Sequence, residues 1–459
     1  MNMSEKIVSL KKKLGFNVFT FSGGIHPDDM KEATCKKPII DLPPSDEMVF
    51  PLSQHIGAPA VPCVQVGDRV LMGQKIAEAG GFVSANIHSS VSGTVVAIEP
   101  RMHHSGIKVN SIVIENDGLD ELSQDVQPKD WKAMSKEEII QVIREAGVVG
   151  MGGATFPTHV KLSPPPDKKI EYAIVNGAEC EPYLTSDHRA MLETPEEVIE
   201  GLKIIMKVLG LNEGYIAIET NKPDAIDMMK KWAAKETRIK IHVVKVKTKY
   251  PQGSEKHLIK AITGRTVPPG KLPLDVGCTV DNIDTCAAIA RAFTMGAPVI
   301  KRIVTVSGDC IAQPANFRIR VGTNVEDAIE KCGGFVKTAA KVIMGGPMMG
   351  ISVPDTDIPV VKGTSGILAF SEEMISKKVK QNCLRCGRCV EGCPMNLLPN
   401  KIIEAVKAGD LDAMQKLNVM DCIQCGSCAY VCPAEQNPLQ QVRTARAKVT
   451  KAAQEAKKQ

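Results

Sequence analysis

The chain has 459 residues, of which 43% are hydrophobic and 24% charged, and its formal net charge is +5. This length predicts about three domains, and this composition excludes a largely disordered chain. Aromatic residues reach only 4%, too few for the stacking platforms that bind single-stranded nucleic acid, so nucleic acid is not an expected partner.

The excess positive charge lies in two terminal segments, residues 1–13 and 441–459. Such segments contact anionic lipid or an acidic partner, or they are solvated chain ends. No apolar segment approaches the roughly 18 residues of a membrane span, and the charged amino terminus lacks the apolar core of a signal peptide. We therefore expect a cytosolic protein without a transmembrane segment, whose 15 cysteines are metal ligands or free thiols.

The amino-terminal third is expected to contain a small all-β domain. Residues 1–45 form a basic, proline-rich extension, and residues 46–118 alternate short apolar runs with glycine turns. This spacing resembles the barrel-sandwich fold of lipoyl and biotinyl domains. Those domains carry a modified lysine on a hairpin, but residues 78–82 here are Glu-Ala-Gly-Gly-Phe, so we predict a structural or docking module.

Residues 130–300 alternate helices and strands, which predicts a Rossmann-like α/β domain with a mostly parallel sheet. Ser135 and Glu138 form a capping box that starts a helix, and Gly147 ends it. Strands are expected at 172–175, 215–218 and 239–246, with helices between them. Residues 301–372 return to short strands around one helix at 325–332, which predicts a β-grasp domain.

Residues 373–440 hold eight of the fifteen cysteines, in two runs of identical spacing. Each run reads Cys-x2-Cys-x2-Cys-x3-Cys-Pro, the ferredoxin pattern in which three thiolates of one run and the fourth of the other hold one cluster. By this symmetry the first [4Fe-4S] cluster takes Cys383, Cys386, Cys389 and Cys432. The second takes Cys422, Cys425, Cys428 and Cys393.

Zinc is the alternative occupant of closely spaced cysteine pairs. A tetrahedral zinc site uses two Cys-x2-Cys pairs and leaves the third and fourth cysteines of each run without a role, so we favour iron–sulfur clusters. Between the runs, the apolar spacing predicts two short helices that break at Gly409 and Asp410. The module therefore resembles an α-helical double ferredoxin, and residues 441–459 follow it as a basic helical tail.

Two loops of the α/β domain carry candidate ligand-binding residues. The glycine-rich segment at 147–157 is a poor dinucleotide fingerprint, because it lacks the third glycine and follows a helix. It either lets a flat ring or a phosphate approach the backbone or forms a tight interdomain turn. The next strand leads into Asn176, Glu179 and Glu181, where open α/β sheets bind ligands, although a solvated loop is the alternative.

The order of these motifs is similar to a known family. The α/β domain resembles the FMN- and NADH-binding subunit of respiratory complex I, and nearly the whole chain resembles the C-subunit family of Rnf ion-translocating ferredoxin:NAD+ oxidoreductases. The motifs that carry the resemblance are Ser22-Gly23-Gly24-Ile25-His26-Pro27, Gln54-His55-Ile56-Gly57-Ala58-Pro59, Gly150-x-Gly152-Gly153-Ala154-x-Phe156-Pro157-Thr158-x-x-Lys161, Asn176-x-x-Glu179-x-Glu181-Pro182, Tyr250-Pro251-Gln252-Gly253-x-Glu255, Asn282-Ile283-Asp284-Thr285 and Gly345-Gly346-Pro347-Met348-Met349-Gly350.

The resemblance implies a non-covalent FMN, two [4Fe-4S] clusters and NAD+ or NADH as substrate. Residues implied to contact FMN are Gly150, Gly152, Gly153, Ala154, Lys161, Asn176, Asn282 and Thr285. Residues implied to contact the nicotinamide nucleotide are Glu179, Glu181 and Glu255. No side chain is assigned as a general acid or base, because the cofactors carry the redox chemistry.

The resemblance also implies partners and a location. Electrons would pass from a partner iron–sulfur protein through the two clusters to FMN and NAD+, or in reverse. The implied partners are the iron–sulfur RnfB protein and the membrane subunits of the Rnf complex, with ferredoxin acting indirectly. The chain would be peripheral, on the cytoplasmic side of the cell membrane, and the pumping of H+ or Na+ would belong to partner subunits.

Two positions depart from the family pattern, because Thr155 and His159 stand where glycines are expected. They motivate an alternative in which the chain is a flavin-free docking and relay subunit of the same kind of complex. A further alternative is the diaphorase subunit of a soluble hydrogenase or formate dehydrogenase.

Overall fold

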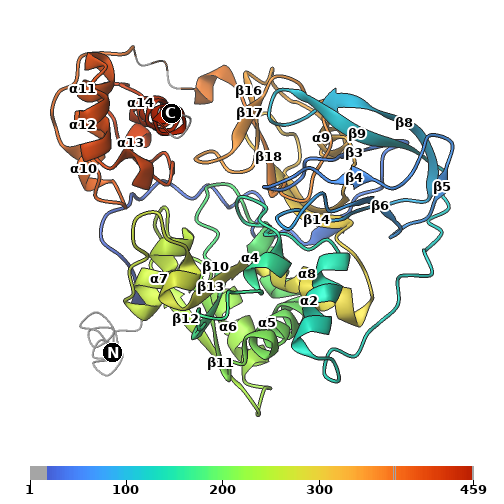
Figure 1. Ribbon diagram of the computed structural model, residues 1–459. Helices are drawn as coiled ribbons and strands as arrows, with labels where there is room; N and C mark the ends of the chain where they lie inside the picture. The colour runs from blue at the N-terminus through green and yellow to red at the C-terminus, as the bar shows by residue number, and fades with distance from the viewer. Residues whose placement is uncertain (1–17, 376, 378, 457–459) are drawn as a thin grey trace.

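The computed structural model describes residues 18–375, 377 and 379–456. The basic segment noted at 1–13 and the tail residues Lys457 and Lys458 lie outside the described residues. In Figure 1 a helix-covered sheet lies below two neighbouring β-rich domains, and a helical module lies to one side. No described helix combines the length and the hydropathy needed to cross a membrane.

Two small sheets form the first β-rich domain, with the strand orders β3-β9-β8-β5 and β4-β6-β7. Met48, Phe50, Ile76 and Ile112 are completely buried in its core. The short apolar runs between glycine turns therefore form the strands of a small β domain, as expected. The strands are β3 (Glu47–Pro51), β4 (Val61–Pro62), β5 (Arg69–Val70), β6 (Lys75–Glu78), β7 (Ile87–His88), β8 (Gly93–Met102) and β9 (Lys108–Asn116).

The α/β domain has a parallel sheet with the order β1-β12-β11-β10-β13. Its strands are β1 (Val18–Phe19), β10 (Tyr172–Gly177), β11 (Glu213–Glu219), β12 (Lys240–Val246) and β13 (Cys278–Asn282). Its helices are α2 (Lys136–Glu145), α3 (Thr158–Lys161), α4 (Ser186–Glu193), α5 (Pro195–Leu209), α6 (Pro223–Ala233), α7 (Glu255–Thr263), η1 (Pro273–Val276) and α8 (Ile283–Thr294). The order of β12, β11, β10 and β13 is that of a Rossmann-like half, which turns back between β10 and β13.

Local signals account for the ends of two of these helices, α2 and α5. Ser135 and Glu138 cap α2 reciprocally, as expected. Pro195 occupies the first turn of α5, and Gly210 ends that helix in a left-handed conformation. Strands β1 and β13 were not expected from the sequence, because neither segment has enough apolar alternation to distinguish it from a loop.

The β-grasp domain has a mixed sheet with the order β17-β16-β18-β14-β15-β2. Its elements are β2 (Ile39–Asp41), β14 (Lys301–Ser307), β15 (Ala315–Arg320), α9 (Val325–Lys331), β16 (Lys341–Met344), β17 (Ile351–Val353) and β18 (Gly366–Phe370), followed by η2 (Glu372–Met374). Strand β2 pairs in parallel with β15. The segment 1–45 is therefore not a separate extension, because its described part supplies β1 and β2 to two different sheets.

The carboxyl-terminal module is helical, as predicted. Its elements are α10 (Arg388–Glu391), α11 (Pro399–Ala408), α12 (Leu411–Lys416), η3 (Val419–Asp421), α13 (Ser427–Tyr430) and α14 (Pro438–Ala456). Gly409 ends α11 in a left-handed conformation, and the side chain of Asp410 caps α12. The described part of the basic tail continues α14.

Candidate functional site

The carboxyl ends of β10 and β13 lie side by side where the strand order turns back. Asn176 of β10 is the register partner of Asn282 of β13. Open α/β sheets bind their ligands in the crevice at such a point. Two residues implied to hydrogen-bond the flavin therefore meet at the edge of the sheet where a ligand is expected.

The glycine-rich segment lies against this edge. A Cβ on Gly152 would lie 2.8 Å from the side chain of Asn282, whereas a Cβ on Gly153 would meet no atom within 4 Å. The amide of Met151 donates to Thr285 Oγ1 at 2.9 Å. The segment is thus fixed on its protein side and open on the other, as a loop that admits a flat ligand must be.

The rest of the segment forms a closed turn. The Gly150 amide donates to the carbonyl of Phe156 at 2.8 Å, and Ala154 is exposed at the tip. Thr158 follows directly, and its buried Oγ1 has no hydrogen-bond partner among the described residues.

A second orphaned group lies in the neighbouring loop. Gln252 is completely buried, and neither polar atom of its amide has a partner among the described residues. It precedes Gly253, whose carbonyl accepts from Asn176 Nδ2 at 2.8 Å. Buried polar groups are normally satisfied. Orphaned groups at the start of α3 and in the loop beside Gly253 fit a polar cofactor such as FMN. Gln252 belongs to one of the motifs noted in the sequence, but no role was predicted for it.

Lys161 brings a flavin candidate and a nucleotide candidate together. Its Nζ donates to the carbonyl of Val280 and lies 3.3 Å from Glu255 Oε1 and 3.5 Å from Asp281 Oδ1. Burial opposes the charged form, but Asp281 and Glu255 raise the pKa of Lys161 above its usual value. Lys161 therefore stays protonated beside this edge of the sheet, with its charge offset by the two carboxylates.

Glu179 and Glu181 lie in the loop that follows β10, which we call the acidic loop, and they contact groups other than Lys161. Glu179 accepts from the backbone amides of Asp187 at 2.7 Å and His188 at 3.2 Å, so it caps α4. Glu181 accepts from the Met348 amide at 2.9 Å in the β-grasp domain. Burial raises the pKa of Glu181 to about 7. Neither carboxylate lies in the cluster of Lys161 and Glu255.

Buried lysines hold the acidic loop from behind. Lys31 donates to the carbonyls of Glu179 and Glu181, both at 3.0 Å, and Lys222 donates to that of Ala178 at 2.7 Å. These contacts offset the cost of turning several carbonyls inward. Lys31 comes from the amino-terminal segment, 148 residues before Glu179 in the chain. The residues around Glu179 therefore gave no basis for predicting this contact.

Two cations of the β-grasp domain hold the glycine-rich segment. Arg302 donates to the carbonyl of Met151 at 3.1 Å and pairs with buried Asp284. Lys362 donates to the carbonyl of Gly147 at 2.7 Å. Neither cation was predicted from the sequence, because the role of each depends on long-range packing.

Lys362 also reaches the first β-rich domain. Its Nζ donates to the carbonyl of Asn86 at 2.6 Å, so one amino group joins three domains. The side chain is completely buried, and within the described residues it forms no ion pair. Burial lowers the pKa of Lys362 to about 7. A neutral amine has two N–H donors, which matches its two carbonyl partners.

The two departures from the family pattern face other domains. His159 Nε2 lies 3.2 Å from the carbonyl of Phe82, on the hairpin where lipoyl domains carry their lysine. Thr155 has a φ of 51°, and its methyl group would lie 2.5 Å from a Cβ on Gly363. Both side chains are therefore used in packing between domains, which removes the observation that favoured a flavin-free chain.

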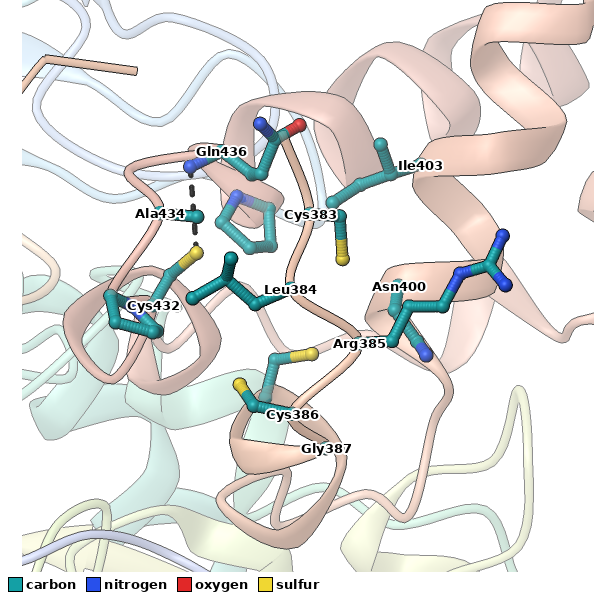
Figure 2. Close-up of a pocket in the computed structure, with 13 residues that line it drawn as sticks. Cys383, Leu384, Arg385, Cys386, Gly387, Asn400, Ile403, Cys432, Ala434 and Gln436 are labelled. Carbon is teal, nitrogen blue, oxygen red and sulfur yellow. Dashed lines mark hydrogen bonds between the residues drawn. The ribbon is translucent and has the colours of Figure 1, made fainter. Parts of the chain in front are cut away.

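The first set of predicted cluster ligands lines one cavity. Cys383, Cys386, Cys389 and Cys432 all border this cavity. Figure 2 shows the sulfurs of Cys383, Cys386 and Cys432 turned toward this space, while Arg385 extends away from it. Cys432 comes from the second run, as the crossed pattern requires.

The second set lines a second cavity, which is bordered by Cys393, Cys422, Cys425 and Cys428. Backbone amides donate to the sulfurs of Cys393 and Cys432, from Leu397 and Gln436 respectively, both at 3.4 Å. Amides directed at sulfur are typical of iron–sulfur sites. Each donor set of four thiols with amide donors therefore fits a [4Fe-4S] cluster.

Across 18–375, 377 and 379–456, no group of three or more His, Cys, Asp or Glu side chains is placed to hold a single metal ion. Metal analysis of the purified protein distinguishes zinc from iron–sulfur clusters at the two cysteine sets.

The second cavity packs against the α/β domain. Tyr250 Oη donates to the carbonyl of Cys425 at 2.7 Å, and His257 Nε2 lies 3.0 Å from the carbonyl of Pro394. Tyr250 Oη also lies 3.4 Å from Glu181 Oε1. The second cavity thus shares a hydrogen-bonded boundary with the domain that carries the flavin candidates. We call this cavity and its cysteine run (422–428) inner, and the first cavity and its run (383–389) outer.

Family models match four segments of the chain. They are the RnfC Barrel sandwich hybrid domain at residues 19–119, the Nuo51 FMN-binding domain at 143–291, the SLBB domain at 303–352 and the 4Fe-4S dicluster domain at 375–433. The multidomain fold expected from the sequence is confirmed, as are FMN and [4Fe-4S] clusters as the cofactors of these domain types.

Curated relatives cover most of the chain. The C subunit of the proton-translocating ferredoxin:NAD(+) oxidoreductase complex of Clostridium ljungdahlii is 49% identical over 88% of this chain and 88% of its own. The C subunit of the Na(+)-translocating complex of Acetobacterium woodii is 47% identical over 88% and 90%. The C subunit of the ion-translocating oxidoreductase complex of Rhodobacter capsulatus is 44% identical over 88% and 78%.

A solved chain of NAD+-reducing [NiFe]-hydrogenase in the air-oxidized state aligns with 87% of this chain and 86% of its own, at 15% identity and a TM-score of 0.48. That superposition is too loose to bear on function. The curated relatives are far more similar and match over nearly their full length. The chain therefore belongs to the C-subunit family of ion-translocating ferredoxin:NAD(+) oxidoreductase complexes.

Proposed function

We propose that this chain exchanges electrons between a partner iron–sulfur protein and NAD+, as the peripheral subunit of a membrane-bound ferredoxin:NAD+ oxidoreductase. Its cofactors in this proposal are two [4Fe-4S] clusters, held by the crossed cysteine sets, and one FMN at the edge formed by Asn176 and Asn282. When bound, FMN supplies the conversion between single electrons and the electron pair of a hydride.

The chain's own residues position these groups. The glycine-rich segment leaves space for a flat ring, while Lys161 supplies a fixed charge and Asn176, Asn282 and Thr285 supply hydrogen-bonding groups. Glu255 lies beside Lys161 and is our candidate for orienting the nicotinamide nucleotide. Glu179 and Glu181 support the loop, and we assign them to shaping the site rather than to direct contact with the nucleotide.

The observation that carries the proposal is the hydrogen bond from Tyr250 Oη to the carbonyl of Cys425. It joins the inner cysteine cavity to the α/β domain, so an electron relay through the module ends beside the flavin candidates. The finer assignments belong to the proposal as well: RnfB and the membrane subunits as partners, a location on the cytoplasmic face of the membrane, and ion translocation by other subunits.

Cofactor analysis of the anaerobically purified chain tests this proposal. We expect about eight irons and one acid-releasable flavin per chain, from two cubanes and one FMN. NADH should bleach the flavin and cluster absorbance in sequence. Protein with full iron but neither flavin nor NADH-driven bleaching would establish the flavin-free relay instead, and zinc in place of iron would refute the relay.

A further inference from the structure

The two cysteine cavities differ in their exposure to solvent. Cys383 and Cys386 of the first cavity are exposed, whereas Cys425 and Cys428 of the second are buried. Leu384, between the two exposed cysteines, leaves 61% of its surface accessible. The first cavity is therefore the place where an electron can be exchanged with another molecule, since the second is covered by the chain itself.

The two runs also differ in charge. The segment 383–389 contains Arg385 and Arg388 and no acidic residue, while 422–428 contains no charged residue. Both arginines are exposed, and within the described part of the chain neither forms an ion pair. Unpaired guanidinium groups around an exposed redox site attract an acidic surface and orient it during encounter.

We propose that Leu384, Arg385 and Arg388 form the docking surface for an acidic protein that carries its own one-electron centre. This inference rests on the proposed function, which requires such a partner. Leu384 supplies an apolar contact at the centre, and the two arginines flank it. An anionic lipid surface would match the charge but would place no electron donor or acceptor beside the exposed cysteines, so a protein is the occupant we favour.

Each docking event moves one electron from the reduced partner to the chain, and no bond forms or breaks. Two such events supply the electron pair that one NAD+ takes up together with one proton. In the reverse direction the partner is reduced by one electron per encounter. The docking surface therefore acts on the rate of encounter rather than on the chemistry at the nucleotide.

The inner run supplies a matched substitution for the test. Gln424 and Ser427 occupy the positions equivalent to Arg385 and Arg388, so R385Q/R388S copies a sequence that already surrounds a predicted cluster in this chain. The charge-reversed variant R385E/R388E gives a stronger effect. K230E/K231E, on the exposed side of α6, is the control for a general change in charge.

The measurement is the second-order rate at which a chemically reduced, acidic two-cluster ferredoxin reduces the full-length holo-chain, at increasing NaCl. We expect salt to slow the wild type, and R385E/R388E to be about tenfold slower at low ionic strength with little salt dependence. R385Q/R388S should fall between the two. Iron content and NADH:ferricyanide activity should match the wild type in every variant.

The outcomes separate the docking surface from the function. If the wild-type holo-chain has no NADH:ferricyanide activity, the proposed function itself is overturned. Normal NADH oxidation with the same ferredoxin rate and salt dependence in R385E/R388E as in K230E/K231E would overturn the docking surface alone. Loss of binding to phosphatidylglycerol vesicles by R385E/R388E without any change in the ferredoxin rate would assign the surface to lipid, which also overturns the proposal.

Discussion

The two cysteine runs have the same backbone and different surroundings. Gly387 and Gly426 have φ angles of 80° and 81°, and Arg385 and Gln424 have φ angles of 52° and 57°. The repeated spacing therefore folds into two equivalent loops. The outer loop faces solvent, while the inner loop packs against the α/β and β-grasp domains.

This difference separates two properties that a cluster site needs. The cysteine spacing determines the cage, because three thiolates on one tight loop and a fourth from the other run define its geometry. The residues between the cysteines determine which surface packs against each loop. Ile423 joins an apolar group with Ile25, Tyr250 and Met348, whereas its counterpart Leu384 has no such cover.

Breaking the crossed ligand pattern should have the largest effect. Cys432→Ala removes the fourth thiolate of the outer site, so we expect about four irons per chain to be lost. Its residual electron paramagnetic resonance spectrum should match that of Cys383→Ala and differ from that of Cys422→Ala. Cys63→Ala, an exposed cysteine outside both runs, is the control. Identical residual spectra for Cys432→Ala and Cys422→Ala would show that each run keeps its own four sulfurs.

Lys362→Met should destabilise the glycine-rich segment that we propose binds FMN. It leaves the carbonyls of Gly147 and Asn86 without their donor, at a cost on the order of 2 kcal/mol of unfolding free energy. We expect weaker FMN binding by fluorescence titration, with iron content unchanged. Lys341→Met, at an exposed position of the same domain, should bind FMN like the wild type.

The same variant should change the pH dependence of stability. Below about pH 7, where burial places the pKa of Lys362, the folded and unfolded chains both keep this proton. Above it the folded chain releases the proton, while the unfolded chain holds it to about pH 10.4, so the unfolding free energy rises with pH in this window. Denaturant titrations should show a smaller rise for Lys362→Met. An equal slope in both proteins would mean that Lys362 stays charged when buried.

Tyr250→Phe should distinguish the inner cluster from the outer one. It removes one hydrogen bond to the carbonyl of Cys425, worth about 1 kcal/mol, and we expect the reduction potential of one cluster only to shift. Spectroelectrochemical titration measures both potentials. Tyr430→Phe is the control, because Tyr430 lies on the same run and is exposed. Equal shifts of both clusters, or none, would contradict the assignment of Cys425 to the inner site.

The smallest effect is expected from Thr155→Gly. The side chain contacts the Gly363 region rather than the open side of the loop, and glycine adopts the left-handed backbone more easily. We expect an unchanged FMN content and an equal or slightly higher stability in thermal unfolding. A several-fold gain in FMN affinity would show that Thr155 obstructs the ring after all.

Local signals were enough wherever a structure is made by near neighbours in sequence. The capping box of α2, the glycine that ends α5 and the break between α11 and α12 all follow from side-chain to backbone contacts within a few residues. The grouping of the cysteines predicted from their spacing agrees with the two cavities that they line, and their role as cluster ligands stays a prediction.

Other features had no local signal. The carboxylate of Glu181 lies against Met348 and Tyr250, 167 and 69 residues away along the chain, and no pattern in the sequence indicated these neighbours. Strands β1 and β2 were hidden in a segment that looked like an extension, because two or three residues carry no measurable periodicity. Thr155 and His159 suggested a blocked flavin site until their contacts with other domains were known.

The sequence by itself determined the repeated cysteine pattern, the capped ends of helices such as α2 and the domain types, since these depend on spacing and on short-range hydrogen bonds. Only the tertiary structure decided which cysteine cavity is exposed, which neighbours surround Glu179 and Glu181 and how Lys362 joins three domains. The physical reason is that burial and the pairing of buried polar groups are set by residues that are distant in the chain, and a linear pattern does not record those distances.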